Sequence, residues 1–179
     1  MASSGSRILA VLVSAAAVVS LAAPAAFSAP SEGSSTVAAL ESGVLRQLNA
    51  VRADHGLLPL RVNTRLTAAA EQHSREMADD GYFDHNSFDG TSFSARLARW
   101  YPVAGFRSWS VAENMLWWSP SVEPSGAVAK WMRSPMHRAN ILNPDWRDIG
   151  VGVVHAGSAG GTYGGRPVTI ITTDFGVRR

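Results

Sequence analysis

Three polar side chains stand out because each of them interrupts strongly apolar surroundings. His85 follows two aromatic residues and an aspartate, Glu113 precedes an apolar run, and His137 follows a serine–proline pair. Imidazole and carboxylate groups together can bind a divalent metal, transfer a proton or hold a polar ligand. We therefore expect these three side chains to converge on one cleft.

Each of these residues, taken alone, also has a structural explanation. A single histidine in a loop, such as His85 or His137, most often makes a hydrogen bond that only holds the loop. A carboxylate such as Glu113 is costly to bury unless it is paired, and a structural salt bridge to Arg96 or Arg138 would meet that cost. The functional alternative for Glu113 is a metal ligand or a general base.

The chain has 179 residues, enough for one domain with a substantial core. It begins as secretory precursors do, with Arg7 before an apolar run and small residues after it. We expect a signal peptide over residues 1–25 (with cleavage after residue 28 as a second option), a flexible tether over 26–35 and one domain over 36–179. An uncleaved amino-terminal anchor is the alternative. Because no later segment is long and apolar enough to cross a membrane, the mature protein is expected to be secreted.

The composition excludes several chemistries. The chain has no cysteine, which rules out disulfides, thiol catalysis and thiolate metal sites. Its 16 basic and 14 acidic residues are interspersed, so we expect no nucleic-acid partner. The six tryptophans indicate a large core. We also expect the protein to be a monomer.

Apolar residues at three- and four-residue steps predict a first helix that Ser35 or Thr36 caps and Gly56 ends. Further helices are predicted over residues 65–80, 94–100 and 124–133. For the helix over residues 65–80, Asn63 or Thr64 is the expected cap and Gly81 is the expected end. Its expected buried stripe comprises Leu66, Ala69, Ala70, His73 and Met77.

The last third of the chain changes to the alternation of strands. Strands are predicted over residues 148–155 and 167–175, joined by a glycine-rich loop over 156–165, with another strand over 106–111. Helices followed by a hairpin favour an α+β layered domain over a parallel βαβ sheet.

Several segments, in this order, resemble the CAP superfamily, which comprises cysteine-rich secretory proteins, antigen 5 and plant pathogenesis-related 1 proteins. The matching segments are 48–57, Phe83-Asp84-His85, Glu113-Asn114, 131–142, 149–153 and 173–176. The resemblance covers about residues 38–176 and is greatest to the bacterial secreted SCP-domain branch. It implies a three-layer α-β-α sandwich around a central antiparallel sheet.

The resemblance also implies a cleft lined by two histidines and two glutamates. His85 and His137 match the histidines, and Glu113 matches one glutamate, with Ala112 in place of the glycine that usually precedes it. Ser134 stands where the second glutamate is expected, so the full set is absent. No cofactor is required by this pattern, but two neutral imidazoles and one carboxylate can bind zinc or another divalent metal with water in an open position. The missing carboxylate weakens binding of a hard cation more than binding of zinc.

Four neighbouring residues are weaker candidates that would support the cleft from behind: Asp89, Arg96, Asn114 and Ser134. Asp89-Gly90 is also a turn signal, and Arg96 could be a solvated helix residue. Ser134 also occupies an ordinary position for a helix cap before a proline.

Three functions compete. The first is a non-enzymatic extracellular binding module for a metal, a small ligand or a cell-envelope component. The second is a metal-assisted hydrolase, acting on protein or cell wall, with Glu113 as base. The third is a structural envelope protein with a vestigial cleft. The chain has neither a His-Glu-x-x-His motif nor a Gly-x-Ser-x-Gly elbow, and Ser134 replaces a carboxylate, so the sequence favours the binding module.

Overall fold

The structure of the protein, a computed structural model, describes residues 32–179. The expected signal peptide and the first part of the expected tether lie outside the described residues. Helix α1 (Glu32–Asp54) begins within the expected tether, so Ser35 and Thr36 lie inside the helix and the prediction that they cap it is wrong. The helix ends near Gly56 as predicted, and the φ of 68° at this residue is one that glycine adopts at little cost.

A four-stranded sheet forms the middle layer. Its strands stand in the order β1 (Arg61–Val62), β3 (Asp148–Ala159), β4 (Arg166–Arg178) and β2 (Trp109–Trp118). The pairs β3–β4 and β4–β2 are antiparallel, whereas the short β1 is parallel to β3. The predicted hairpin is confirmed, but both of its strands are longer than expected and the loop contains a 3₁₀ turn, η1 (Gly161–Tyr163).

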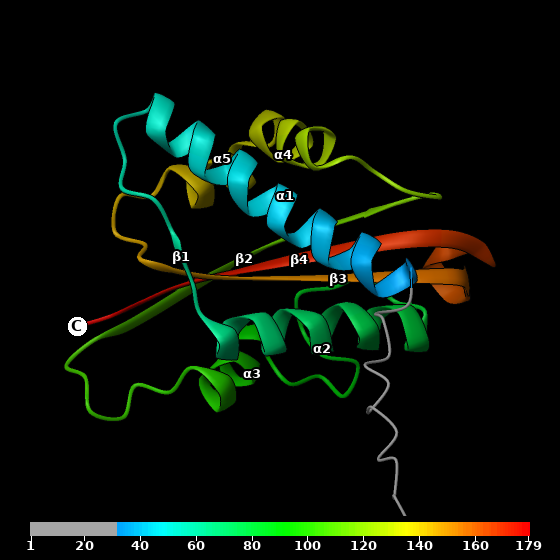
Figure 1. The fold of residues 1–179 in the computed structure, drawn as a ribbon. Helices are drawn as coiled ribbons and strands as arrows, with labels where there is room; N and C mark the ends of the chain where they lie inside the picture. Colours follow the sequence, from blue (N-terminus) through cyan, green and yellow to red (C-terminus); the bar gives the residue numbers. More distant parts are fainter. Residues whose placement is uncertain (1–31) are drawn as a thin grey trace, which may run out of the picture.

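Helices cover both faces of this sheet. They are α1, α2 (Thr64–Asp80), α3 (Phe93–Trp100), α4 (Pro124–Arg133) and α5 (Pro135–Leu142). Figure 1 shows α1, α4 and α5 on one side of the strands and α2 with α3 on the other. The predicted α+β fold, a three-layer α-β-α sandwich, is therefore confirmed. Among residues 32–179, no helix has the length and apolar character needed to span a membrane.

Local chemistry explains the position of α2. The side chain of Asn63 accepts hydrogen bonds from the backbone N–H groups of Arg65 and Leu66, at 3.1 and 3.3 Å, as a helix cap does. Gly81 ends the helix with a φ of 70°. The predicted buried stripe is confirmed, and His73 within it is fully buried. The loop that carries His85 follows directly from this helix end.

Arg52 joins the carboxyl end of α1 to the carboxyl end of α5. Its side chain is fully buried, and its Nη1 donates to the backbone carbonyls of Ile141 and Asn143 at 2.7 and 2.9 Å. A third bond runs from Nε to the carbonyl of Leu58 at 3.0 Å. These charge-assisted bonds satisfy carbonyl groups that the helix end leaves without partners. These bonds hold α5, which carries His137, against the end of α1.

Candidate functional site

Glu113 lies in the middle of β2 and is bound on both carboxylate oxygens. Its Oε1 is 2.8 Å from Nδ1 of His85, and its Oε2 accepts from Nη2 of Arg96 on α3 at 2.5 Å. The side chain of Glu113 is 1% exposed, whereas that of His85 is 49% exposed. The structural interpretation of Glu113 thus has its partner in Arg96, and Arg138 is exposed to solvent. Glu113 reaches the surface through His85.

Asp174 brings a second carboxyl group to the same cluster. It pairs with Glu113 across β2 and β4, is fully buried, and has Oδ2 3.9 Å from Nη1 of Arg96. Burial and the negative charge of Glu113 raise the pKa of Asp174 well above its ordinary value. Burial also opposes ionisation of Glu113, but the hydrogen bond from His85 and the charge of Arg96 outweigh it and lower the pKa of Glu113. The two shifts are opposite in direction, so ionisation is favoured at Glu113 and opposed at Asp174.

His85 has one ring nitrogen left for a ligand. Because an ionised carboxylate only accepts, Nδ1 of His85 carries the proton that Glu113 accepts, and Nε2 is open to a ligand when the ring is neutral. The hydrogen bond to Glu113 and the negative charges of Glu113 and Asp84 outweigh burial and raise the pKa of His85. The edge of the ring also contacts Phe93, with the ring centroids 6.3 Å apart. Contacts on these sides fix the orientation of the imidazole.

His137 lies in the first turn of α5 and is held beside Glu113 by amide side chains. Asn114 donates to the backbone carbonyl of His137 at 3.0 Å. Asn140 donates to the side-chain oxygen of Asn114 at 2.8 Å and to the backbone carbonyl of Glu113 at 3.2 Å. The network fixes α5 against β2.

Burial, followed by the positive charge of His85, lowers the pKa of His137. The imidazole of His137 is therefore neutral near neutral pH and available as an acceptor or ligand.

The weaker candidates divide into two groups. Arg96 and Asn114 both hold the site, Arg96 through Glu113 and Asn114 through the backbone of His137. Asp89 is exposed, and its carboxylate accepts from the backbone N–H of Thr91 at 2.8 Å, so it forms the turn. Ser134 occupies the cap position of α5, but its side chain makes no capping hydrogen bond.

His73 was identified from the sequence only as a buried helix residue, but it also supports the site. Its Nε2 is 3.0 Å from the backbone carbonyl of Asp84, the residue before His85, and its Nδ1 is 3.3 Å from Oε2 of Glu76. Burial and the charge of Arg96 lower the pKa of His73. The residue therefore attaches the loop of His85 to α2.

The donor atoms limit how a metal could bind. Within the described part of the chain, no group of three or more histidine, aspartate or glutamate side chains is arranged to hold a metal ion. Both oxygens of Glu113 already have partners, so this carboxylate is placed to orient His85 rather than to be a ligand itself. Two imidazoles, from His85 and His137, remain as protein ligands.

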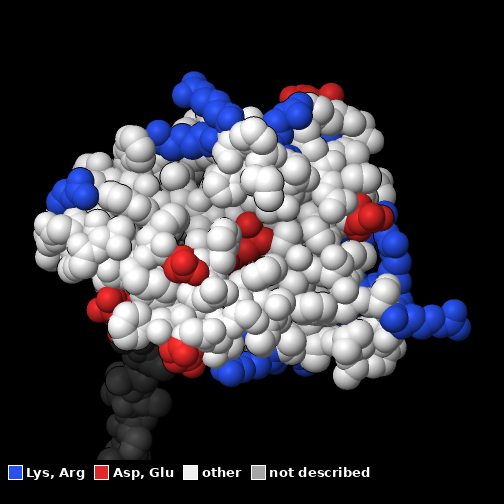
Figure 2. Space-filling model, turned by 180° about the vertical axis from the view of Figure 1, so that it is seen from behind, with Lys and Arg blue, Asp and Glu red and all other residues white. Residues whose placement is uncertain are grey.

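Figure 2 shows the face opposite to that of Figure 1. Acidic side chains lie near the middle of this face, and one of them is recessed in a hollow among uncharged atoms. Lysine and arginine side chains lie mainly toward its margins. This face therefore presents uncharged and acidic surface at its centre rather than a basic stripe.

The three-layer fold carries the His85–Glu113 pair and holds the backbone of His137 to β2 through Asn114. The sequence matches the Cysteine-rich secretory protein (CAP) family over residues 45–173, and the chain belongs to this family. It is 37% identical over 125 residues to the Uncharacterized protein YkwD of Bacillus subtilis (strain 168), an alignment that covers 69% of this chain and 46% of that protein. The Uncharacterized membrane protein YlbC of the same organism is 31% identical over 113 residues, 63% of this chain and 31% of that protein. The chain thus spans less than half the length of these relatives.

Solved structures show the same fold. An extracellular protein containing a SCP domain from Bacillus anthracis str. Ames matches with a TM-score of 0.64 and 24% identity, covering 84% of this chain and 44% of that chain. An outer surface protein from Borrelia burgdorferi matches with a TM-score of 0.59 and 18% identity, covering 79% of this chain and 94% of that chain. At these identities the likeness concerns the fold alone.

Proposed function

We propose that this CAP domain acts outside the cell as a non-enzymatic binding module whose His85–Glu113–His137 cleft takes a divalent metal, such as zinc, or a small polar ligand. One observation carries the proposal: Nδ1 of His85 is held by the buried carboxylate of Glu113, which leaves Nε2 for a ligand, and Asn114 on the same strand holds the backbone of His137.

The donor set fits zinc better than harder cations. Neutral imidazole nitrogens are common zinc ligands, and a carboxylate behind a ligating histidine fixes its ring and raises its basicity. His85 and His137 would hold the metal, Glu113 would orient His85, and water would complete the coordination. A bound zinc ion supplies a Lewis acid that polarises oxygen ligands.

The hydrolase alternative requires Glu113 to take a proton from water. A general base works best when its pKa is close to the working pH, whereas the pKa of Glu113 is lowered and both of its oxygens have partners. These features support binding over catalysis. If the protein is nevertheless a hydrolase, its activity must disappear in Glu113→Gln.

Calorimetric titration with zinc tests the proposal, on protein purified without a polyhistidine tag. The wild type should bind zinc, and the double variant His85→Ala/His137→Ala should bind at least about tenfold more weakly because both nitrogen ligands are gone. His55→Ala is the matched control, since His55 is an exposed histidine at the end of α1, and it should leave affinity unchanged. Equal zinc affinity in wild type and double variant contradicts the metal site and favours a vestigial cleft.

An extracellular location is part of the proposal. It is supported by the apolar leader of the sequence and by two proteins of the same fold that are described as extracellular and as an outer surface protein. A protein in that location meets the cell envelope, so an envelope component is the class of partner that we propose. Cell fractionation should recover the protein outside the cytoplasm, and recovery only in the cytoplasm contradicts this part.

A further inference from the structure

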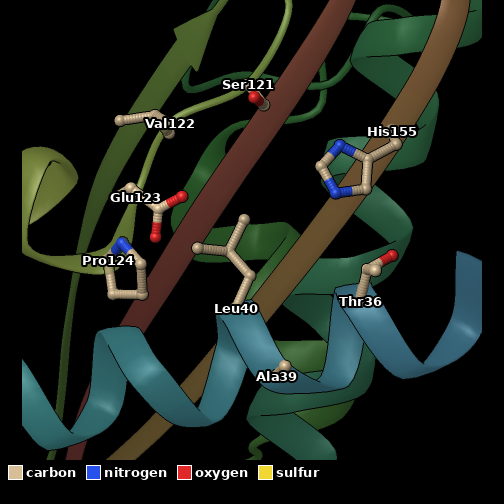
Figure 3. A pocket seen from close by; sticks show the side chains of 8 residues that line it. All are labelled: Thr36, Ala39, Leu40, Ser121, Val122, Glu123, Pro124 and His155. Carbon is tan, nitrogen blue, oxygen red and sulfur yellow. The ribbon is translucent and has the colours of Figure 1, made fainter.

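A second hollow lies between α1, the segment that joins β2 to α4, and β3. Its volume is about 450 Å³, within the range of about 300–1,000 Å³ typical of small-molecule sites. Figure 3 shows the side chains that line it, which come from all three of these segments. It shares no lining residue with the His85–Glu113–His137 cleft.

The floor of this cavity is apolar and rigid. Leu40, Val122 and Pro124 supply its apolar surface. At Gly43, α1 passes so close to the start of α4 that an added Cβ would lie 2.5 Å from Cγ of Pro124. The glycine therefore permits the close approach that holds the two walls together.

His155 presents a hydrogen-bond acceptor to the cavity. The hydroxyl of Thr169 donates its one proton to the carbonyl of Pro120 at 2.9 Å, and its oxygen is 2.7 Å from Nδ1 of His155. Since the hydroxyl proton is already used, Nδ1 must be the donor in this pair, and Nε2 of the neutral ring is then an acceptor. Figure 3 shows the ring directed into the cavity.

Glu123 presents a carboxylate from the opposite wall. It occupies the cap position of α4, yet its side chain makes no capping hydrogen bond. Figure 3 shows this carboxylate facing the cavity, and among the described residues that line it Glu123 is the only Asp, Glu, Lys or Arg. The start of α4 carries a partial charge of about +0.5, which a full negative charge at Glu123 exceeds.

We propose that this cavity binds a primary ammonium group carried on a short apolar chain. We expect the ammonium to pair with the Glu123 carboxylate and to donate one of its other protons to Nε2 of His155, with its carbon chain over Leu40 and Val122. A free alkylamine and the side chain of a lysine in a peptide share this chemistry.

Nuclear magnetic resonance titration tests the proposal with three probes, of which the first two have the same number of carbon atoms. These are n-pentylamine, pentanoate as its oppositely charged counterpart, and Nα-acetyl-lysine methylamide. We expect n-pentylamine to shift the resonances of His155 and Leu40 with millimolar affinity, and pentanoate to leave them unchanged. Equal binding of the lysine derivative supports a peptide-borne lysine, and binding of the free amine alone supports a small-molecule ligand. Absence of binding by both amines, or equal binding of pentanoate, overturns the proposal.

Two variants sharpen the test. Glu123→Gln should weaken n-pentylamine binding by about three- to fivefold, as loss of one partly exposed ion pair does. Asp54→Asn removes the same charge from the far end of α1, which the rise of a helix places about 20 Å from Leu40 in the cavity. This variant should leave the affinity for n-pentylamine unchanged. Unchanged affinity in Glu123→Gln overturns the proposal.

Which ring nitrogen of His155 accepts a hydrogen bond can be checked without any ligand. The nitrogen-15 shifts of His155 should report a proton on Nδ1, and Thr169→Val should abolish this preference. A proton on Nε2 in the neutral wild-type ring overturns the arrangement on which the proposal depends.

Discussion

Glu113, Arg96 and Asp174 form a buried cluster of two carboxyl groups and one guanidinium. The pKa of Glu113 is lowered and that of Asp174 is raised, so ionisation is favoured at Glu113, which faces the guanidinium, and opposed at Asp174. Pairing of the Glu113 carboxylate with the guanidinium of Arg96 makes the burial of both groups tolerable. His85 alone connects it to solvent, because its side chain is half exposed.

Removing Arg96 should be strongly destabilising. Arg96→Ala leaves the carboxylate of Glu113 buried without its cation, and breaking a buried pair in this way costs about 3–5 kcal/mol. The double variant Arg96→Ala/Glu113→Gln removes the unpaired charge and should recover part of that loss. Urea unfolding of the single and double variants measures both. A double variant that is no more stable than Arg96→Ala contradicts the pairing.

Asp174 should make the stability depend on pH. Its pKa is raised in the folded protein, so between its ordinary pKa and its folded pKa the native state holds a proton that the unfolded chain releases. Stability therefore falls as pH rises through that range. Asp174→Asn, which mimics the neutral acid, should lose this dependence and melt a few degrees higher than wild type at about pH 8, with little difference near pH 4. Thermal melts at several pH values test this, and parallel pH profiles for the two proteins would refute it.

At the scale of elements, α2 contacts β3 through glycine. A Cβ added at Gly152 would lie 2.2 Å from the backbone nitrogen of Glu71, too close to be accommodated without moving the helix. Gly152→Ala should cost about 1–3 kcal/mol or more in the free energy of unfolding, as overpacking does. Gly157→Ala is the matched control in the same strand, because nothing lies within 4 Å of an added Cβ there. Similar stability of both variants would contradict the close packing.

The sequence predicts elements best where periodicity and caps agree. The α4 boundaries and the Asn63 and Gly81 caps of α2 follow directly from residue type. β1 has only two residues, too few to show alternation. The strand predicted over residues 106–111 overlaps β2 only at 109–111, and the second half of β2 is missed because it is apolar without alternation. The start of α1 is placed too late because Ser35 and Thr36 are good caps but lie inside the helix.

A site residue can be predicted from the sequence where its type contrasts with the residues around it. His85, Glu113 and His137 are polar groups in apolar surroundings, and the structure brings His85 into contact with Glu113. Asp174 and His73 were not predicted as site residues. Their roles depend on the register of β2 with β4 and on the path of the loop after α2, neither of which is encoded in local sequence.

In the molecule as a whole, the proposed site depends on three separate segments. The loop after α2 brings His85, strand β2 brings Glu113, and α5 brings His137. Buried hydrogen bonds from His73, Arg96 and Asn114 fix these segments relative to one another. A site held in this way is pre-organised for a ligand, which reduces the entropy lost on binding.

Crystals soaked in zinc and measured at its absorption edge test most directly whether His85 and His137 together bind a divalent metal. We expect an anomalous difference peak about 2.0–2.1 Å from Nε2 of His85 and from one ring nitrogen of His137, with Glu113 still hydrogen-bonded to Nδ1 of His85. Zinc found only at other histidines, such as His55, or no peak between His85 and His137, would contradict it.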